Sequence, residues 1–248
     1  QAKLKKHMRR ILLYVLLFLL LPAIFVAGRA YPVYAQDAHK ITGKYLNKLG
    51  GKWKLRRLDE IYFQVDVTIN GMQFEAHVYH KDASKYKQVL LFRGDTVQQQ
   101  IYNNGKAYVS SFNSQASLPE NQVKAFHHQA YIFPELAMEA DGYQLSYEGQ
   151  EYLNRIKTHK IKVTAPSGYT FNLWYHHKTG MRVRSRYPTG EPGQEAYQVC
   201  DIMQYRKIKG IQLPVYKRIA TGDAVIVMKL NGIRFPELSN EDFRIPGQ

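Results

Sequence analysis

Apolar and polar side chains alternate with a period of two along much of this chain, and that pattern constrains the fold more than any other feature. Its clearest instance spans residues 61–80, where Asn70 and Gly71 separate two alternating runs. An Asn-Gly pair between such runs is the strongest short-range signal for a β-hairpin. The apolar positions of the predicted hairpin are Phe63, Val65, Val67 and Ile69, followed by Met72, Phe74, Ala76 and Val78.

Similar strand patterns recur as far as residue 234, separated by turn signals such as Arg93-Gly94-Asp95 and Lys209-Gly210. About a dozen short strands in meander order are too many for a small flat sheet, and a sheet of that size curls toward a barrel. The chain is also rich in large flat side chains, with 19 tyrosines and 11 phenylalanines. Because a strongly curved sheet has more concave surface than two or three short helices can cover, we expect an apolar cavity.

Residues 37–51 break the alternation with a helical pattern. Asp37 can cap a helix, the pair Gly50-Gly51 can end it, and Ile41, Tyr45 and Leu49 fall on one stripe. The sequence therefore predicts a short helix before the first strand.

A second helical pattern interrupts the strands after Ser117, which lies at capping-box spacing from Glu120. Val123, Phe126 and Ala130 then follow at helical spacing, and Pro134 forces a break into another short helix. We therefore expect a short, proline-broken helical segment between two groups of strands.

Residues 1–35 have the pattern of a secretory signal. An unbroken apolar run covers residues 11–27, and Val33-Tyr34-Ala35 places small residues at the two key positions of a cleavage site. The run has 17 residues and contains Pro22, whereas a membrane-spanning helix needs about 20 residues. We expect cleavage after Ala35 and one domain over residues 36–248, with a retained membrane anchor as the alternative.

The net charge is +15, and removing the predicted signal leaves 29 basic against 20 acidic residues, or +9. This balance favours anionic neighbours such as a phospholipid membrane surface, although a solvated basic face without a partner is the commoner explanation. Arg182, Arg184 and Arg186 alternate along one predicted strand and would share one face, with the same two explanations. Nucleic acid is not an expected partner of an exported protein.

The sequence indicates neither a metal site nor a catalytic centre. Cys200 is the only cysteine, so no internal disulfide can form, and it is expected to be a small core residue. Neither HExxH nor GxSxG occurs, and the adjacent histidines at 127–128 and 176–177 would point to different faces. We therefore expect no cofactor, no metal and no enzymatic activity, with a secreted hydrolase as the least favoured alternative.

Several stretches, in this order along the chain, resemble the LolA-type outer-membrane lipoprotein carrier and sorting proteins. They are "IYFQVDV", "NGMQFEAHVYHKDASKYKQVLLF", "QQIYNNGKAYV", "PENQVKAF", "FPEL" and "NEDFRIP". The resemblance covers nearly all of residues 37–248, and its most specific part runs from "YHKDASKY" to "YNNGKAYV". It implies a mainly β fold with short helices: an unclosed antiparallel β-barrel, or half-barrel, covered by a helical lid.

The resemblance also implies a periplasmic carrier or chaperone that shelters acyl chains of lipoproteins or lipids for transfer towards the outer membrane. In that family a basic residue, typically an arginine before a proline, ties the sheet to the lid. The equivalent stretch here is His80-Lys81-Asp82, and Lys81 is the nearest substitute. The expected lid residues are Val123, Phe126 and Ala130, and the expected cavity residues are Phe63, Val65, Val67, Phe74, Ala76, Val78, Tyr86, Leu90, Ile101, Phe171 and Leu173.

The alternative from another functional class is a non-transport envelope protein whose barrel core is fully packed and which acts through its surface. Cavity volume separates the two hypotheses. An open apolar cleft of several hundred cubic ångströms supports ligand binding, whereas a filled interior supports the surface role.

Overall fold

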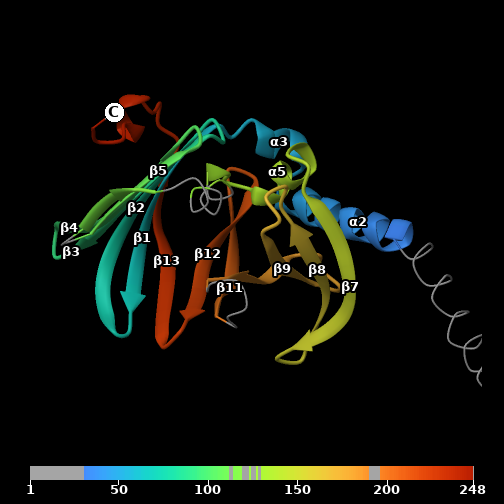
Figure 1. Cartoon of the computed structure of the whole chain (residues 1–248). Helices are drawn as coiled ribbons and strands as arrows, with labels where there is room; N and C mark the ends of the chain where they lie inside the picture. Colours follow the sequence, from blue (N-terminus) through green and yellow to red (C-terminus); the bar gives the residue numbers. More distant parts are fainter. Residues whose placement is uncertain are drawn as a thin grey trace, which may run out of the picture.

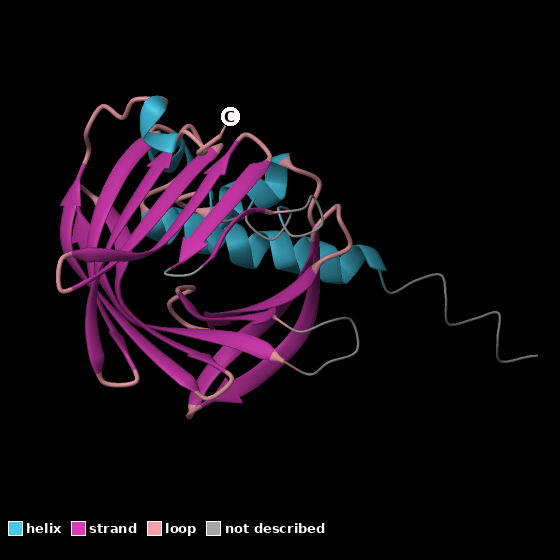
Figure 2. Ribbon diagram, turned by 60° about the vertical axis from the view of Figure 1, so that its left-hand side comes forward, coloured by secondary structure: helices cyan, strands magenta, loops and turns pink. Residues whose placement is uncertain are grey.

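The computed structural model describes residues 31–111, 114–118, 123, 127, 130–189 and 196–247. Thirteen strands form one antiparallel sheet in the order β6-β5-β4-β3-β2-β1-β13-β12-β11-β10-β9-β8-β7. The terminal strands of this order, β6 and β7, do not pair, so the sheet curves around an interior without closing (Figures 1 and 2). The predicted half-barrel is therefore confirmed. The strands are β1 (Glu60–Ile69), β2 (Met72–Lys81), β3 (Lys85–Phe92), β4 (Asp95–Asn103), β5 (Lys106–Ser111), β6 (Ser114–Ser117), β7 (Gln144–Leu153), β8 (Ile156–Thr164), β9 (Thr170–His176), β10 (Arg182–Pro188), β11 (Tyr197–Ile208), β12 (Ile211–Thr221) and β13 (Ala224–Arg234).

The sheet consists of two meanders joined at one strand pair. β1 to β6 form the first meander and β7 to β13 the second, and each strand pairs with its neighbour in sequence. The first and last strands of the whole sequence, β1 and β13, then pair with each other from Tyr62 opposite Arg234 to Ile69 opposite Ile226. We call β1 to β6 the first arm and β7 to β13 the second arm. The long-range pairing of β1 with β13 joins the two arms into a single curved surface.

The predicted hairpin at residues 61–80 is confirmed as β1 and β2. Ile69 pairs with Met72 around the turn, in which Asn70 has a φ of 47° and Gly71 a φ of 89°. Positive φ at both central residues is the requirement of a type I′ turn, whose twist matches that of the flanking strands. The register of the whole arm follows from this turn.

A bulge in β10 changes the direction of one arginine. Arg182 pairs with Tyr175 but Arg184 pairs with Trp174, so Val183 is the extra residue. A bulge of this kind re-aims the side chains before it. Arg182 consequently faces the concave side with Tyr175, and only Arg184 and Arg186 keep the outward direction. The predicted face of three arginines is therefore wrong.

The helices are α2 (Tyr31–Leu49), α3 (Lys52–Arg56), α5 (Pro134–Ala140) and the 3₁₀ turn η2 (Glu241–Phe243). The first predicted helix ends before Gly50 as expected, but it begins at Tyr31 rather than after Asp37, and the predicted cleavage site lies within it. Tyr45, Leu46 and Leu49 are buried in the core against β8, β9 and β12. No described helix is both long and apolar enough to span a bilayer.

The expected helix start at Ser117 is also different in the structure. Ser117 is the last residue of β6 and pairs with Tyr108 of β5. Serine is compatible with either environment, and the unpaired edge of β5 offers backbone hydrogen bonds that a sequence pattern does not reveal. Pro134 occupies the first turn of α5, where its missing N–H costs no hydrogen bond.

The C-terminal segment packs on the outer face of the sheet. Ile245 forms a small buried cluster with Ile101 and Tyr108, and Phe243 is completely buried. The 3₁₀ turn that contains Phe243 packs over β3 and β4, inside the strand order and not at an edge of the sheet. Figure 1 shows this segment, in red, above the first arm.

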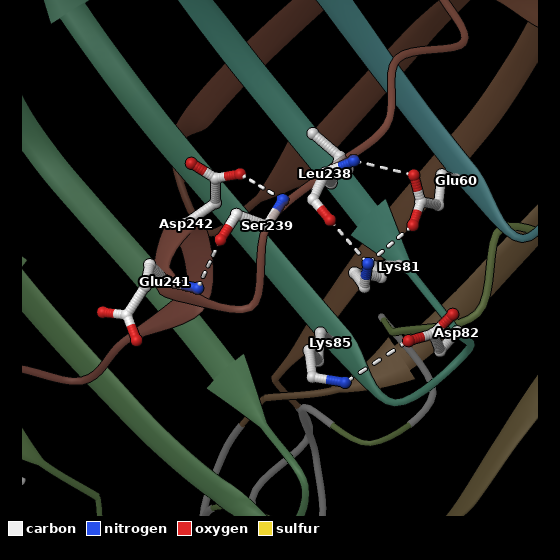
Figure 3. Close-up of polar contacts among 8 residues, drawn as sticks. All are labelled: Glu60, Lys81, Asp82, Lys85, Leu238, Ser239, Glu241 and Asp242. Carbon is white, nitrogen blue, oxygen red and sulfur yellow. Dashed lines mark hydrogen bonds and ion pairs between the residues drawn. The ribbon is translucent and has the colours of Figure 1, made fainter.

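Lys81 holds the C-terminal segment to the sheet (Figure 3). Its Nζ donates hydrogen bonds to Glu60 Oε1 at 2.6 Å and to the Leu238 carbonyl oxygen at 2.5 Å. The backbone N–H of Leu238 donates in turn to Glu60 Oε2 at 2.7 Å. The hydrogen bond from Lys81, followed by the one from Leu238, lowers the pKa of the Glu60 carboxyl.

Replacing Lys81 with methionine should release the C-terminal segment, because both Glu60 and the Leu238 carbonyl lose a charged donor. We expect amide hydrogens of residues 238–245 to exchange roughly tenfold faster while strand amides keep their protection. Lys85→Met is the matched control, since Lys85 pairs with Asp82 at 3.4 Å beside the same site. Equal exchange in both variants would contradict the assigned role of Lys81.

Candidate functional site

A cavity of about 760 Å³ lies on the concave side of the sheet and takes its wall from both arms. β1 to β4 supply one side and β10 to β13 the other, while residues 131, 132 and 134, at the start of α5, lie at its end. Drug-sized and cofactor-sized ligands occupy cavities of this order. The described side chains of the half-barrel therefore leave part of its interior unfilled.

Most of the cavity residues predicted from the first arm line this space. Their shared feature is the period-two alternation of β1, β2 and β3, which places one set of side chains on the concave face. Phe74 shares that face, because it pairs with Val67, but its ring packs on Phe92 and does not line the cavity. The predicted residues that do line it are Phe63, Val65, Val67, Ala76, Val78, Tyr86 and Leu90.

Phe171 and Leu173 lie on the concave face of the second arm but under helix α2. They are 3% and 0% exposed and belong to the same core as Tyr45 and Leu46. The helix covers this part of the sheet completely, so these two side chains hold α2 in place instead of lining the cavity. The strand pattern gives the face of a residue but not which part of that face a helix covers.

Ile101 lies on the opposite face of the sheet from the cavity. Tyr86 lines the cavity and pairs with Tyr102, so Ile101, one residue earlier, points outward. There it packs against Ile245 of the C-terminal segment. The prediction that Ile101 lines the cavity is therefore wrong, because the next residue, Tyr102, has the inward position.

The wall formed by β11, β12 and β13 was not predicted from the sequence. These strands have an apolar set at period two, and that signal was available, but no local pattern shows that β13 pairs with β1. The pairing brings this set opposite the first arm. Its members in the cavity are Cys200, Ile202, Leu213, Val215, Ile219, Ile226, Met228 and Leu230.

The cavity also has polar groups, at distinct places in its wall. Gln88 and Gln100 pair across β3 and β4, and Gln98 follows on the same face. The hydroxyl of Tyr86 donates to Gln88 Oε1 at 2.7 Å. Lys217 of β12 contributes a cationic side chain. The cavity is therefore amphiphilic, with an apolar majority and separate polar positions.

Two of the three predicted lid residues lie in the described part of the chain, and Phe126 lies outside it. Val123 and Ala130 are 7% and 0% exposed and pack in one cluster with Val65 and Val78 of the first arm. They therefore cover part of the apolar concave face that also lines the cavity.

His80, and not Lys81, hydrogen-bonds the sheet to Ala130, one of the expected lid residues. His80 lines the cavity, and its Nδ1 lies 3.2 Å from the carbonyl oxygen of Ala130, which accepts a hydrogen bond from the tautomer protonated at Nδ1. Lys81 is the next residue in an extended strand, so it points to the outer face and binds the C-terminal segment. Burial is the main cause that lowers the pKa of His80 to about 4.

A buried ion pair connects α5 to the second arm. Arg182 Nη1 lies 2.6 Å from Glu135 Oε1, and the Tyr175 hydroxyl donates to the same oxygen at 3.2 Å. Burial, together with the charge of Glu135, raises the pKa of Tyr175, so the phenol remains a donor. The bulge that turns Arg182 inward is what makes this contact. The segment over the cavity is thus attached to both arms, through His80 and through Glu135.

The described residues contain no group of three or more histidine, cysteine, aspartate or glutamate side chains arranged to hold a metal ion.

The buried His80 should make the protein less stable in acid. The unfolded chain binds a proton at His80 near pH 6.5, whereas the folded chain does so near pH 4, so the free energy of unfolding falls as pH decreases through this window. The loss should reach about 2 to 3 kcal/mol by pH 4.5. Urea unfolding of His80→Gln should show a smaller loss between pH 7 and pH 4.5 than the unmodified protein.

His39→Gln is the control for this measurement, because His39 is exposed on α2. It should keep the full pH dependence of the unmodified protein. An unchanged acid sensitivity in His80→Gln would show that His80 titrates normally.

The chain matches no protein-family model, and no curated protein sequence matches it. Several solved structures, in contrast, match the structure of this chain. A LolA superfamily protein from Nitrosomonas europaea aligns with a TM-score of 0.59 at 12% identity, over 84% of this chain and 97% of that one. A DUF1329 family protein from Desulfovibrio piger aligns with a TM-score of 0.56 at 14% identity, over 85% and 97%.

A third structure is an outer membrane lipoprotein-sorting protein domain from Vibrio parahaemolyticus, with a TM-score of 0.57 at 9% identity over 84% of this chain and 97% of that one. Identities this low carry information about architecture alone. The curved open sheet, its helical cover and these three alignments together establish that the chain has a LolA-like fold.

Proposed function

We propose that this protein is a periplasmic carrier that holds acyl chains of lipoproteins or lipids in its concave cavity, for transfer towards the outer membrane. Cleavage of residues 1–35 is part of the proposal, and catalysis is not. The observation that carries it is the open cavity of about 760 Å³ with a mainly apolar wall. A protein that acted only through its surface would have no use for such a space, which argues against the packed-core alternative.

The energetics of the cavity suit transfer rather than permanent storage. Complete burial of an acyl chain of about 14 methylenes would contribute roughly 11 kcal/mol, which would make release slow. Polar side chains such as Gln88 and Gln98 interrupt the apolar wall, so a bound chain gains less than this limit. The fold of the solved neighbours, one of which is a lipoprotein-sorting domain, is consistent with this role.

The proposal includes a place where the carrier meets an anionic membrane. Helix α3 exposes Trp53, which is 69% accessible, while Leu55 anchors the helix in the core. The guanidinium of Arg57 lies 3.8 Å from the Trp53 ring, and Lys54 and Arg56 are also exposed. Aromatic rings flanked by cations favour the interface of an anionic bilayer.

Filling the cavity should abolish ligand uptake without unfolding the sheet. Met228 lines the cavity on β13, whereas Val227, its neighbour, faces outward. Met228→Trp should weaken binding of a fluorescent fatty acid by roughly tenfold or more, because the indole occupies the space of the chain. Binding is measured by fluorescence titration, with circular dichroism as the folding control.

Val227→Trp is the matched variant, because it adds the same side chain to the outer face of the same strand. It should bind the fatty acid as the unmodified protein does. Equal binding by both tryptophan variants, or no binding by the unmodified protein, would contradict the carrier hypothesis.

Removing the exposed tryptophan should reduce membrane association. We expect Trp53→Ala to bind phosphatidylglycerol vesicles roughly tenfold more weakly, since a large aromatic side chain no longer enters the interface. Tyr152→Ala is the control, because Tyr152 is also 69% exposed but lies on β7, away from α3. Vesicle sedimentation gives the affinities, and an equal loss in both variants would contradict a specific role for α3.

A further inference from the structure

Lys217 lies within an apolar part of the cavity wall. It pairs with Met228 of β13 on one side and with Ile202 of β11 on the other, and both partners also line the cavity. Paired residues of antiparallel strands share a face, so the lysine side chain rises from between these two apolar neighbours. Its charge also reaches His80 on the other arm, where it adds to the effect of burial on the histidine.

Lys217 differs from the other cationic side chain in the wall, Arg182, in having no carboxylate partner. Arg182 is neutralised by Glu135 at 2.6 Å. In the described part of the chain, Lys217 forms no ion pair, and no aspartate or glutamate lines the cavity. The cavity therefore carries one positive charge that the described residues of its wall do not compensate.

This arrangement penalises a purely apolar ligand. An acyl chain that fills the cavity displaces the water around the Lys217 ammonium, and a cation that loses water without gaining a partner is costly. A head group with a negative charge replaces that water with a charge-assisted hydrogen bond. Glu135 neutralises Arg182, and the remaining polar side chains of the described wall, such as Gln88 and Gln98, carry no charge, so recognition of charge depends on Lys217.

We propose that the cavity selects anionic amphiphiles, whose carboxylate or phosphate head group pairs with Lys217 while the acyl chain lies on the apolar wall. This inference rests on the proposed carrier function and adds to it the chemical class of the ligand.

The test compares ligands that share one acyl chain and differ in whether the head group is anionic or neutral. Palmitate and its methyl ester have the same chain, as do monopalmitoyl glycerol phosphate and monopalmitoyl glycerol. Each ligand displaces a neutral fluorescent probe, N-phenyl-1-naphthylamine, from the purified protein. We expect at least one anionic member to bind roughly tenfold to hundredfold more tightly than its neutral counterpart. The pair that shows the larger preference tells whether a carboxylate or a phosphate is the better head group.

Three variants test whether Lys217 causes the preference for anionic ligands. Lys217→Met should abolish it while leaving the neutral ligands bound as before or more tightly. Lys217→Arg should retain it, because the charge is kept. Lys229→Met is the control, since Lys229 is exposed on the outer face of β13 and its loss changes the net charge equally. Circular dichroism and urea unfolding check that each variant is folded.

The outcomes separate this inference from the carrier function. If no ligand displaces the probe from the unmodified protein, the carrier function itself fails, and this inference fails with it. If neutral and anionic ligands bind equally, or if Lys217→Met keeps the preference, the inference about Lys217 is overturned and the carrier function stands.

Discussion

The pairing of β1 with β13 is the contact on which the rest of the structure depends. Each arm is a meander whose strands pair with sequence neighbours, and such a meander alone has one exposed apolar face. Joining the arms edge to edge makes their apolar faces converge, from Phe63 and Val65 on one side to Met228 and Leu230 on the other. The contact joins segments more than 150 residues apart, so its entropic cost is met only when both arms can bury surface together.

The helices fill the two ends of this curved surface unequally, and the cavity is the part that remains. Helix α2 covers β8 and β9 so closely that Leu173 and Tyr175 are completely buried. Among the described residues the first arm has no such long helix, and its cover includes Val123 and Ala130. Two polar contacts add to this apolar packing: a hydrogen bond from His80 to Ala130 and an ion pair from Arg182 to Glu135. Directional contacts of this kind favour one geometry of the segments that they join.

The sequence was sufficient to predict the elements that have strong local patterns. It was insufficient where a shift of one residue determines whether a side chain faces the cavity or the outside. The hairpin of β1 and β2 follows from alternation and the Asn70-Gly71 turn, and five of the predicted cavity residues line the cavity as a result. Ile101 and Lys81 were each misplaced because a neighbour, Tyr102 or His80, occupies the inward position. The predicted direction of Arg182 was wrong because a bulge at Val183 turns it inward, and no sequence pattern indicated that bulge. The wall from β11 to β13 could not be assigned, because it depends on the pairing of β1 with β13.

For the proposed carrier function, the balance between holding and releasing a ligand would follow from the mixture of polar and apolar groups in one wall. An entirely apolar cavity would bind an acyl chain by an amount that grows with each methylene, so that release would become slower as chains lengthen. Polar side chains such as Gln88 and Gln100 limit the binding free energy of the acyl chain, because their hydrogen bonds are best made to water or to a polar part of the ligand. An uncompensated cation at Lys217 then adds a contribution that depends on the head group rather than on chain length. Selectivity and affinity are thereby set by different parts of the same wall, and a carrier can discriminate among ligands without binding any of them too tightly to deliver.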